Sequence, residues 1–187
     1  SHEADRVLIF RGDMFRLQKD YHNAIMSYAE APLAAPQGKN LPLALLRTGD
    51  IYFRDLKDNG MARNVWSELL DKYPASLEAG RGSIFLAEIE ESEKNYGQAV
   101  TRLEEAVLRY PFPEIKAECY ARIGRIYMDY LASPDKAIAS YKRTVDEFPA
   151  EPRAAEALIR IGGIHESRRY YRDAVDAYRR LAELFPD

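Results

Sequence analysis

The sequence contains few of the residues that form covalent cross-links or metal sites. Among its 187 residues there is one cysteine, Cys119, so no intramolecular disulfide can form, and cysteine usage indicates no compartment. The three histidines, His2, His22 and His165, are scattered, and no His/Cys cluster has the spacing of metal ligands. We therefore interpret His22 and His165 as packing or surface residues and expect no metal site.

No motif for catalysis or for a cofactor is present either. The segment "GKN" at Gly38 lacks the rest of a phosphate-binding loop, and Cys119 has no histidine near it in the sequence to make it a nucleophile. The glutamates within residues 88–93 are interpreted as a solvated helix face. We expect a protein that is not an enzyme and that uses no cofactor.

Charge and hydropathy exclude two further classes. The 27 Lys and Arg against 30 Asp and Glu leave a net charge of −3, without the basic excess that nucleic-acid binding usually requires. No apolar run approaches the roughly 20 residues that a membrane-spanning helix needs. We expect neither a nucleic-acid partner nor a membrane span in this chain.

What the sequence does have is a repeat with three kinds of anchor residue. A small residue recurs at an almost constant interval, at Gly12, Gly49, Ala87, Gly124 and Gly162. An alanine follows each of these at a nearly constant distance, at Ala24, Ala62, Ala99, Ala137 and Ala174. A proline follows each alanine at a strictly constant distance, at Pro36, Pro74, Pro111, Pro149 and Pro186. A repeat of this length predicts a solenoid, in which each unit packs on its neighbours.

Each anchor has a packing reason. A glycine inside a helix costs about 1 kcal/mol relative to alanine, so regularly placed small residues indicate that two helices approach closely. The bulky residue four positions after each alanine lies on the same helix face and is expected to fill that space. These residues are Tyr28, Trp66, Leu103, Tyr141 and Tyr178. The closing proline ends the second helix, because it lacks an N–H group.

This order of anchors resembles the tetratricopeptide repeat (TPR) family, over about residues 4–187. The resemblance implies an all-α, right-handed TPR solenoid of five antiparallel helical hairpins, about ten helices, in a single array. The expected repeats are about 4–38, 39–75, 76–112, 113–150 and 151–187. Two departures are Ala87 in place of glycine and Arg63 in place of an aliphatic residue. The period exceeds the usual one of the family by three or four residues, which suggests longer helices.

Caps and prolines predict where the helices begin and end. The expected helices are about 3–19, from 21 onward, 40–56, 58–73, 76–94, 96–109, 113–131, 134–148, 152–167 and 170–185. Asn40, Asp58 or Asn59, Ser76 and Ser133 are expected at helix N-termini. Pro32 lies four residues before the closing proline, and we expect it to break or kink the second helix around residues 29–31.

In the TPR family the first helices of the hairpins line a concave groove, which commonly binds an extended or helical peptide. The groove positions of the family that we carry over as partner contacts are Arg16, Leu17, Leu46, Asp50, Phe53, Arg54, Arg81, Ile84, Arg125 and Met128. Arginine suits planar carboxylates, and Phe53 and Met128 are expected as apolar anchors. The leading hypothesis is a scaffold that binds a protein or peptide partner in assembly of a bacterial multiprotein complex. An ordinary solvated surface is the alternative interpretation of these positions.

A second hypothesis is self-association. The last repeat would present an apolar stripe, Val175, Tyr178, Leu181 and Phe185, through which a homo-oligomer could form. A clamp for the C-terminal tails of chaperones is argued against, because Ile9 and Asp13 stand where that subfamily has lysine and asparagine.

The ends and the style of the repeats suggest an origin. Ser1 and His2 look like the remnant of a cleaved tag, and no polar capping helix follows the last repeat, so we expect a fragment of a longer protein. The segments "ASLEAGR", "FPEIKAECY" and "AEPRAAEAL" are similar in style to bacterial cell-envelope TPR proteins. This favours a bacterial source and a periplasmic or envelope location, with the cytoplasm left open.

Overall fold

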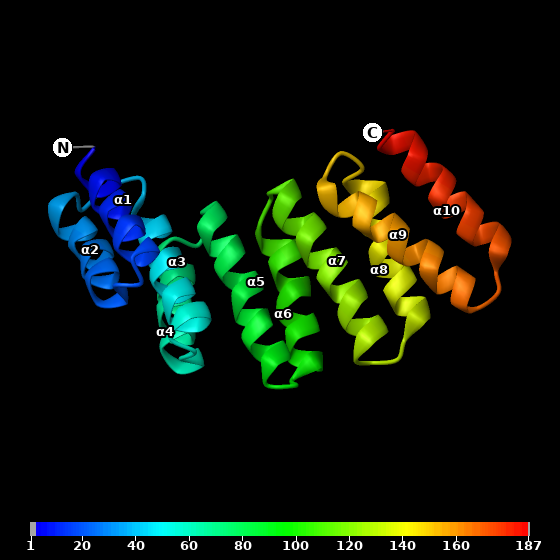
Figure 1. Ribbon diagram of the computed structural model, residues 1–187, viewed down its shortest axis with the longest axis horizontal. Coiled ribbons are helices and arrows are strands. Elements are labelled where there is room, and N and C mark those ends of the chain that lie inside the picture. Colours follow the sequence, from blue (N-terminus) through cyan, green and yellow to red (C-terminus); the bar gives the residue numbers. More distant parts are fainter. Residues whose placement is uncertain (1–2, 187) are drawn as a thin grey trace. The chain divides into compact units, whose positions relative to one another are not determined.

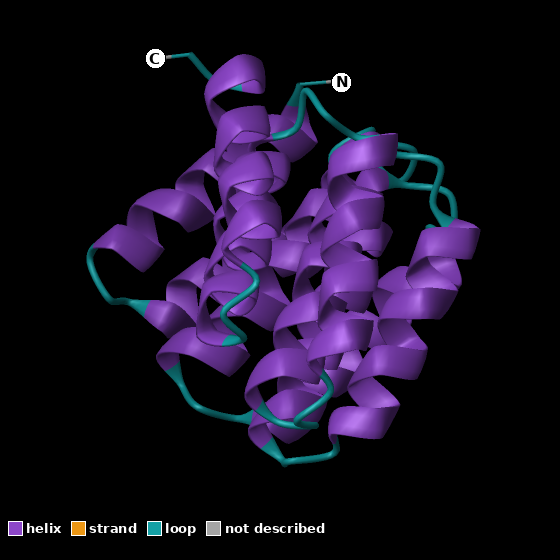
Figure 2. Cartoon of the chain, turned by 90° about the vertical axis from the view of Figure 1, so that its right-hand side faces the viewer, coloured by secondary structure: helices purple, strands orange, loops and turns teal. Residues whose placement is uncertain are grey.

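The computed structural model describes residues 3–186, and these residues form helices without a strand (Figure 2). The helices of this part are α1 (Ala4–Leu17), α2 (Tyr21–Ala34), α3 (Leu41–Asp50), a π-helical turn η1 (Ile51–Asp55), α4 (Asn59–Lys72), α5 (Leu77–Ser92), α6 (Tyr96–Arg109), α7 (Pro113–Asp129), α8 (Pro134–Glu147), α9 (Pro152–Ser167) and α10 (Tyr171–Leu184). The expected all-α fold of about ten helices is confirmed. The predicted tag remnant, Ser1 and His2, lies outside the described residues.

The chain divides into two compact units, Ser1–Ile89 and Glu90–Asp187, with the division inside α5. In the first unit α1 pairs with α2 and α3 with α4; in the second α7 pairs with α8 and α9 with α10 (Figure 1). Each pair is an antiparallel hairpin. Each unit has an apolar core, around Tyr28 and Ile51 in the first and around Tyr141 and Ile161 in the second.

The small anchors meet the aromatic anchors as the repeat predicts. A β-carbon on Gly124 would lie 2.7 Å from Tyr141 Cε1, and one on Gly162 would lie 2.5 Å from Tyr178 Cε1. Gly12 and Gly49 face Tyr28 and Trp66 in the same way. The glycines therefore let the second helix of a hairpin press an aromatic ring directly onto the backbone of the first, at distances that leave no room for a methyl group.

The turn between the two helices of each repeat contains one residue in the left-handed region of backbone space. These residues, with φ between 46° and 63°, are Lys19, Lys57, Lys94, Ala132 and Arg169. At the first turn the N–H of Asp20 donates to Phe15 O at 2.9 Å, a bond that closes the end of a helix after a left-handed residue. Glycine, the usual signal for this conformation, is absent from these five positions, so sequence reasoning did not predict it.

The second and fourth repeats contain one extra residue between the small anchor and the alanine, and both accommodate it in the same way. Leu56 N–H donates to Ile51 O at 2.9 Å, and Leu131 N–H donates to Ile126 O at 3.1 Å. Both are bonds to the fifth residue back, wider than the α-helical pattern. In the second repeat this widening is the turn η1. The extra residue between the small anchor and the alanine is thus accommodated by a wider helical turn near the end of the first helix.

The expected break at Pro32 is wrong, whereas the kink expected as its alternative stays a prediction. α2 continues through Pro32 to Ala34, and Ala35 N–H donates to Ala31 O at 3.0 Å. Proline removes one donor, the N–H that would have bonded to Tyr28 O, but the last turn of the helix is still closed by this bond.

Asn40 and Ser133 stand at the N-cap positions of α3 and α8 as expected, but neither side chain makes the capping hydrogen bond. The backbone and side-chain nitrogens of Asn40 both donate to Asp5 Oδ2, at 2.9 and 3.1 Å. Ser133 donates to Leu131 O at 3.0 Å instead of accepting from its own helix. Each side chain bonds to a different partner: Asn40 to the buried carboxylate of Asp5 in α1, and Ser133 to the carbonyl of Leu131.

The other two cap expectations are confirmed. Asp58 accepts from Met61 N–H at 2.9 Å at the start of α4, and Ser76 accepts from Ala79 N–H at 3.0 Å at the start of α5. Both are the side-chain-to-N3 bonds that favour these residue types at helix N-termini.

Candidate partner-binding faces

The ten predicted contact residues are divided between the two units. Arg125 and Met128 belong to the second, and the other eight belong to the first. Leu46 and Ile84 are 6% and 4% exposed, so their side chains lie in the core and offer almost no surface to a partner. The remaining candidates lie at least partly at the surface, Leu17 and Arg81 among the exposed ones.

Three of the four predicted arginines, Arg16, Arg54 and Arg125, are engaged with carboxylates of this chain. Arg16 of α1 pairs with Asp50 of α3 at 2.6 Å, and also with Asp55 at 2.8 Å. Arg54 of η1 pairs with Asp50 at 2.6 Å and with Glu88 of α5 at 3.2 Å. These ion pairs join successive first helices of the first unit. A partner carboxylate would have to displace an internal one, which weakens the case for these arginines as peptide contacts.

The pairs between neighbouring first helices share one spacing along the sequence. They are Asp13–Arg47 at 3.6 Å, Arg16–Asp50 at 2.6 Å and Arg54–Glu88 at 3.2 Å in the first unit, and Glu91–Arg125 at 2.5 Å in the second. Each pair uses the position directly after a small anchor, occupied in turn by Asp13, Asp50, Glu88 and Arg125. We call these four pairs the ion-pair ladder.

Phe53 packs within the first unit and does not stand out from it as an anchor. Its ring meets that of Trp66 edge to face, with centroids 5.7 Å apart, and Trp66 meets Phe85 at 5.1 Å. The Arg54 guanidinium lies 5.6 Å from the Phe53 centroid and 5.3 Å from that of Phe85, so it covers both rings. Trp66 is fully buried and donates from Nε1 to Leu46 O at 3.2 Å.

The interpretation of residues 88–93 as a solvated acidic face is wrong for two of the glutamates. Glu90 is buried and accepts from Arg102 at 2.7 and 2.8 Å. The Glu91 side chain is also largely buried and accepts from Arg125. These carboxylates hold α5 residues against α6 and α7 within the second unit. Sequence reasoning missed them because both partners lie on other helices, 12 and 34 residues further along the chain.

The ion-pair ladder stops at the fifth repeat, where Gly163 takes the position after the small anchor. A β-carbon there would meet nothing within 4 Å. A hollow of about 550 Å³ lies at this place, lined by Met128 and Asp129 of α7, by Ile159, Arg160 and Gly163 of α9, and by Tyr178 of α10. We call it the Gly163 hollow. Met128 is 37% and Ile159 is 53% exposed, so apolar surface lies open beside it.

The predicted stripe on the last repeat is only partly open. Val175 is 54% exposed on α10, whereas Leu181 and Phe185 pack against the apolar core of the second unit and Tyr178 is half-buried. The exposed part of this stripe is therefore smaller than the sequence pattern suggests, and self-association through it remains a prediction.

The described residues offer little for catalysis or metal binding. Within residues 3–186 no group of three or more His, Cys, Asp or Glu side chains is arranged to hold a metal ion. Cys119 is fully buried, and burial raises the pKa of its thiol to about 12, so it is a poor nucleophile. In the same part of the chain no helix combines the length and the apolar character that crossing a bilayer requires.

Comparison with known proteins identifies the family. Two models described as tetratricopeptide repeat match the chain, over residues 43–76 and 129–187. Together with the helices described above, these matches establish that the chain is a tetratricopeptide repeat protein with an all-α TPR solenoid fold. This is a non-catalytic type of fold, used in general as a scaffold for protein–protein interaction.

The individual proteins most relevant here are distant. The human protein O-mannosyl-transferase TMTC1 is 26% identical over 188 residues, and the chain spans 20% of the length of that relative. Among solved structures, MamA is 22% identical with a TM-score of 0.65, covering 98% of this chain and 93% of its own. A Rap protein complexed with competence and sporulation factor is 20% identical with a TM-score of 0.64, covering 95% of this chain and 52% of its own. At these identities the solved structures show the fold alone.

Proposed function

We propose that this protein is a scaffold that binds a segment of a partner protein, and that the Gly163 hollow receives an apolar side chain of that segment. The observation that carries the proposal is the interruption of the ion-pair ladder at Gly163. In the other four repeats the corresponding position holds a charged side chain engaged with a neighbouring repeat. In the fifth repeat this position is Gly163, which has no side chain, and the apolar side chains of Met128 and Ile159 border the open space.

The hollow has the properties of an anchor site. Interfaces derive most of their binding energy from a few apolar or aromatic side chains that enter pockets and lose their water. The hollow combines Met128, whose flexible thioether adapts to differently shaped groups, with charged edges at Asp129 and Arg160. Met128 was among the predicted contacts; Gly163 was not, because a glycine at that position carries no side chain to attract notice.

The proposed mechanism is binding without chemistry. The family fold is of a non-catalytic type, and the Rap structure carries a named factor in its complex, which supports a peptide or protein as the class of partner. We further propose assembly of a multiprotein complex as the role of this binding. Arg125 stays a proposed contact at the surface of the second unit, subject to its pairing with Glu91.

The test uses a library of random peptides displayed on phage, selected on this protein. Selected peptides are synthesised, and their dissociation constants are measured for the parent and for Gly163→Glu. The new side chain starts in open space and reaches into the hollow, so we expect at least about a tenfold loss of affinity for peptides with an apolar anchor.

Gly97→Glu is the matched control. Gly97 is exposed in the first turn of α6, and a β-carbon there also meets nothing within 4 Å. The Gly97→Glu substitution adds the same charge to the same unit, away from the hollow, and should leave the affinity for the selected peptides unchanged. Peptides that bind both variants as tightly as the parent would show that the partner segment does not use the Gly163 hollow.

A further inference from the structure

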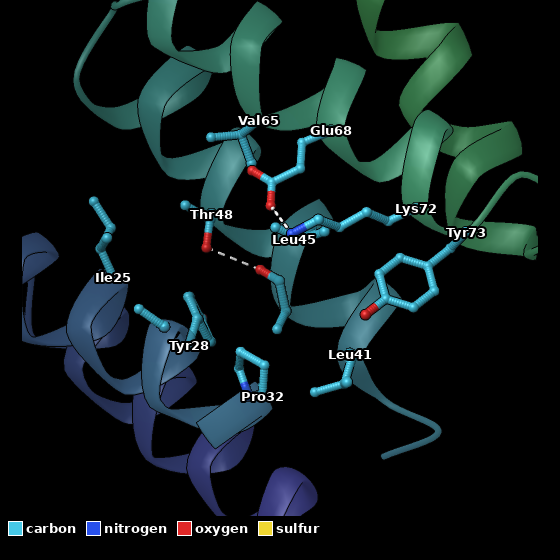
Figure 3. A pocket seen from close by; sticks show the side chains of 12 residues that line it. Ile25, Tyr28, Pro32, Leu41, Leu45, Thr48, Val65, Glu68, Lys72 and Tyr73 are labelled. Atoms are coloured by element: carbon cyan, nitrogen blue, oxygen red, sulfur yellow. Dashed lines mark hydrogen bonds and ion pairs between the residues drawn. The ribbon is translucent and has the colours of Figure 1, made fainter. Parts of the chain in front are cut away.

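A second pocket, in the first unit, lies apart from the ion-pair ladder and the Gly163 hollow. It has a volume of about 300 Å³ and lies between α2, α3 and α4 (Figure 3). Its walls are mainly apolar, and they include Ile25 and Pro32 of α2, Leu41 and Leu45 of α3, and Val65 of α4. No residue of the ion-pair ladder lines it.

The pocket differs from its counterpart in the second unit. There, a smaller hollow of about 200 Å³ lies between α8, α9 and α10, and its lining combines apolar side chains such as Leu158 with the charged Asp173 and Arg180. Val145 occupies the repeat position that Pro32 holds in the first unit, at the same distance after the alanine anchor. The larger, apolar pocket of the first two repeats is thus not reproduced at the equivalent place between the last two.

Hydrogen-bond acceptors are among the polar atoms of the pocket lining, beside the Lys72 ammonium at its edge. Thr48 donates its hydroxyl proton to Ala44 O at 2.9 Å, so its oxygen retains lone pairs that can accept. Pro32 has no N–H, so the carbonyl of Tyr28, one turn earlier, lacks its helical donor. The hydroxyl of Tyr73 points toward the middle of the pocket in Figure 3. Because the Thr48 and Tyr73 oxygens can both accept, a ligand that carries a donor can form a hydrogen bond there.

We propose that this pocket binds the side chain of a tryptophan from a partner protein segment. A dry cavity of about 150 Å³ is enough for benzene, so 300 Å³ accommodates the two fused rings of an indole. Indole is a donor only, which matches the acceptor oxygens of Thr48 and Tyr73 within the mainly apolar lining. Tryptophan is also among the residues most enriched as binding anchors.

The mouth of the pocket suits a protein segment. Glu68 and Lys72 of α4 form an exposed ion pair at 2.6 Å at its edge, and both line the pocket. They give it a polar rim beside an apolar interior, the arrangement that accompanies anchor pockets at interfaces. This site goes beyond the proposed function, because it lies on other elements and in the other unit.

The first experiment titrates N-acetyl-tryptophan amide into ¹⁵N-labelled protein and follows the backbone amides by NMR. We expect saturable shifts at residues of α2, α3 and α4 around the pocket. N-acetyl-leucine amide should bind about tenfold more weakly, and the N1-methyl derivative of the tryptophan probe about fivefold more weakly, because it has lost its donor. Equal binding of all three probes, or no saturable shift at the pocket, would overturn the proposal.

Two variants on α2 locate the site. Ala29 is exposed and lines the pocket, so Ala29→Phe should fill the mouth and abolish the shifts. Met26 is exposed on the same helix and does not line the pocket, so Met26→Phe should leave them unchanged. Unchanged binding to Ala29→Phe would place the probe elsewhere and refute the site. Gly163→Glu should bind the probe like the parent, which separates this result from the test of the proposed function.

The source of the indole is tested with a ten-residue peptide containing one central tryptophan. We expect it to bind at least as tightly as the amide probe, with the same amides shifted, and to lose binding when its tryptophan is replaced by leucine. Exclusion of the peptide while the amide probe still binds would refute a protein segment as the ligand and leave a small indole compound.

Discussion

The contact between Gly49 and Trp66 offers the sharpest test of how these hairpins pack. A β-carbon on Gly49 would overlap the Trp66 ring at Nε1. The ring cannot easily move away, because it is fully buried between Phe53 and Phe85 and its Nε1–H donates to Leu46 O at 3.2 Å. We therefore expect Gly49→Ala to destabilise the protein.

The expected magnitude follows from three contributions. Overpacking of a filled core costs about 1–3 kcal/mol, and an immovable ring places this site near the upper end. Displacing Trp66 Nε1 from Leu46 O leaves a buried donor without its acceptor, at about 1–3 kcal/mol if the bond is lost entirely. Alanine in a helix recovers about 1 kcal/mol relative to glycine. The net expectation is a loss of about 2 kcal/mol of unfolding free energy if the hydrogen bond survives, and of up to about 5 kcal/mol if it is lost.

Gly163→Ala is the matched control, since it makes the same change in another first helix where the new methyl group meets nothing within 4 Å. It should gain about 1 kcal/mol from helix propensity alone. Urea unfolding followed by circular dichroism and by the fluorescence of Trp66 measures both variants. A Gly49→Ala variant as stable as the parent, or a Gly163→Ala variant that is destabilised, would refute this account of the packing.

Three further predictions concern the turns, one buried carboxylate and the cysteine. Lys57 has φ of 58°, so Lys57→Gly should raise the free energy of unfolding by about 0.5–1 kcal/mol in the same urea assay. A lower free energy of unfolding would mean that the Lys57 side chain makes a needed contact. Although burial of Asp5 acts in the opposite direction, N–H donors from Asn40 and Arg6 hold its pKa below the ordinary 3.8. Its charged form therefore stabilises the fold above the unfolded pKa, and this stability disappears as the pH falls through the folded pKa. The stability advantage of the parent over Asp5→Asn should accordingly shrink in urea unfolding below about pH 4; a difference independent of pH would contradict it. Because the pKa of the buried Cys119 thiol is about 12, Ellman's reagent at pH 8 should label it only after urea unfolds the chain, and rapid labelling of native protein would show that α7 opens.

The periodic features were well predicted, because they depend on residues close together in the chain. The spacing of small residue, alanine and proline predicted the paired helices, and the bounds of α6 and α9 match the expectation to the residue. Gly124 against Tyr141 was also foreseen, since residues at equivalent helix positions meet wherever two antiparallel helices pack. A capping serine such as Ser76 acts within its own first turn and needs no tertiary contact.

The candidate site was predicted less well. The resemblance placed Arg16, Arg54 and Arg125 at the surface of the first helices, but no local pattern showed that each faces a carboxylate of a neighbouring repeat. Leu46 and Ile84 were expected at that surface and are buried. Whether a position at the edge of a helix face is open depends on how the next helix rotates and crosses against it, which no pattern within one helix specifies.

The sequence by itself determined the family, the number of helices and the rings that fill the space between them, because helix propensity, capping and the repeat period act along the chain. Only the tertiary structure decided which charges neutralise one another and where a space remains. Asn40 met Asp5 across 35 residues, and Glu88 met Arg54 across 34 residues, because stacked helices bring such positions within hydrogen-bond distance. Gly163 became part of a hollow for the same reason: the packing of α7, α9 and α10 leaves open the space into which a β-carbon would point.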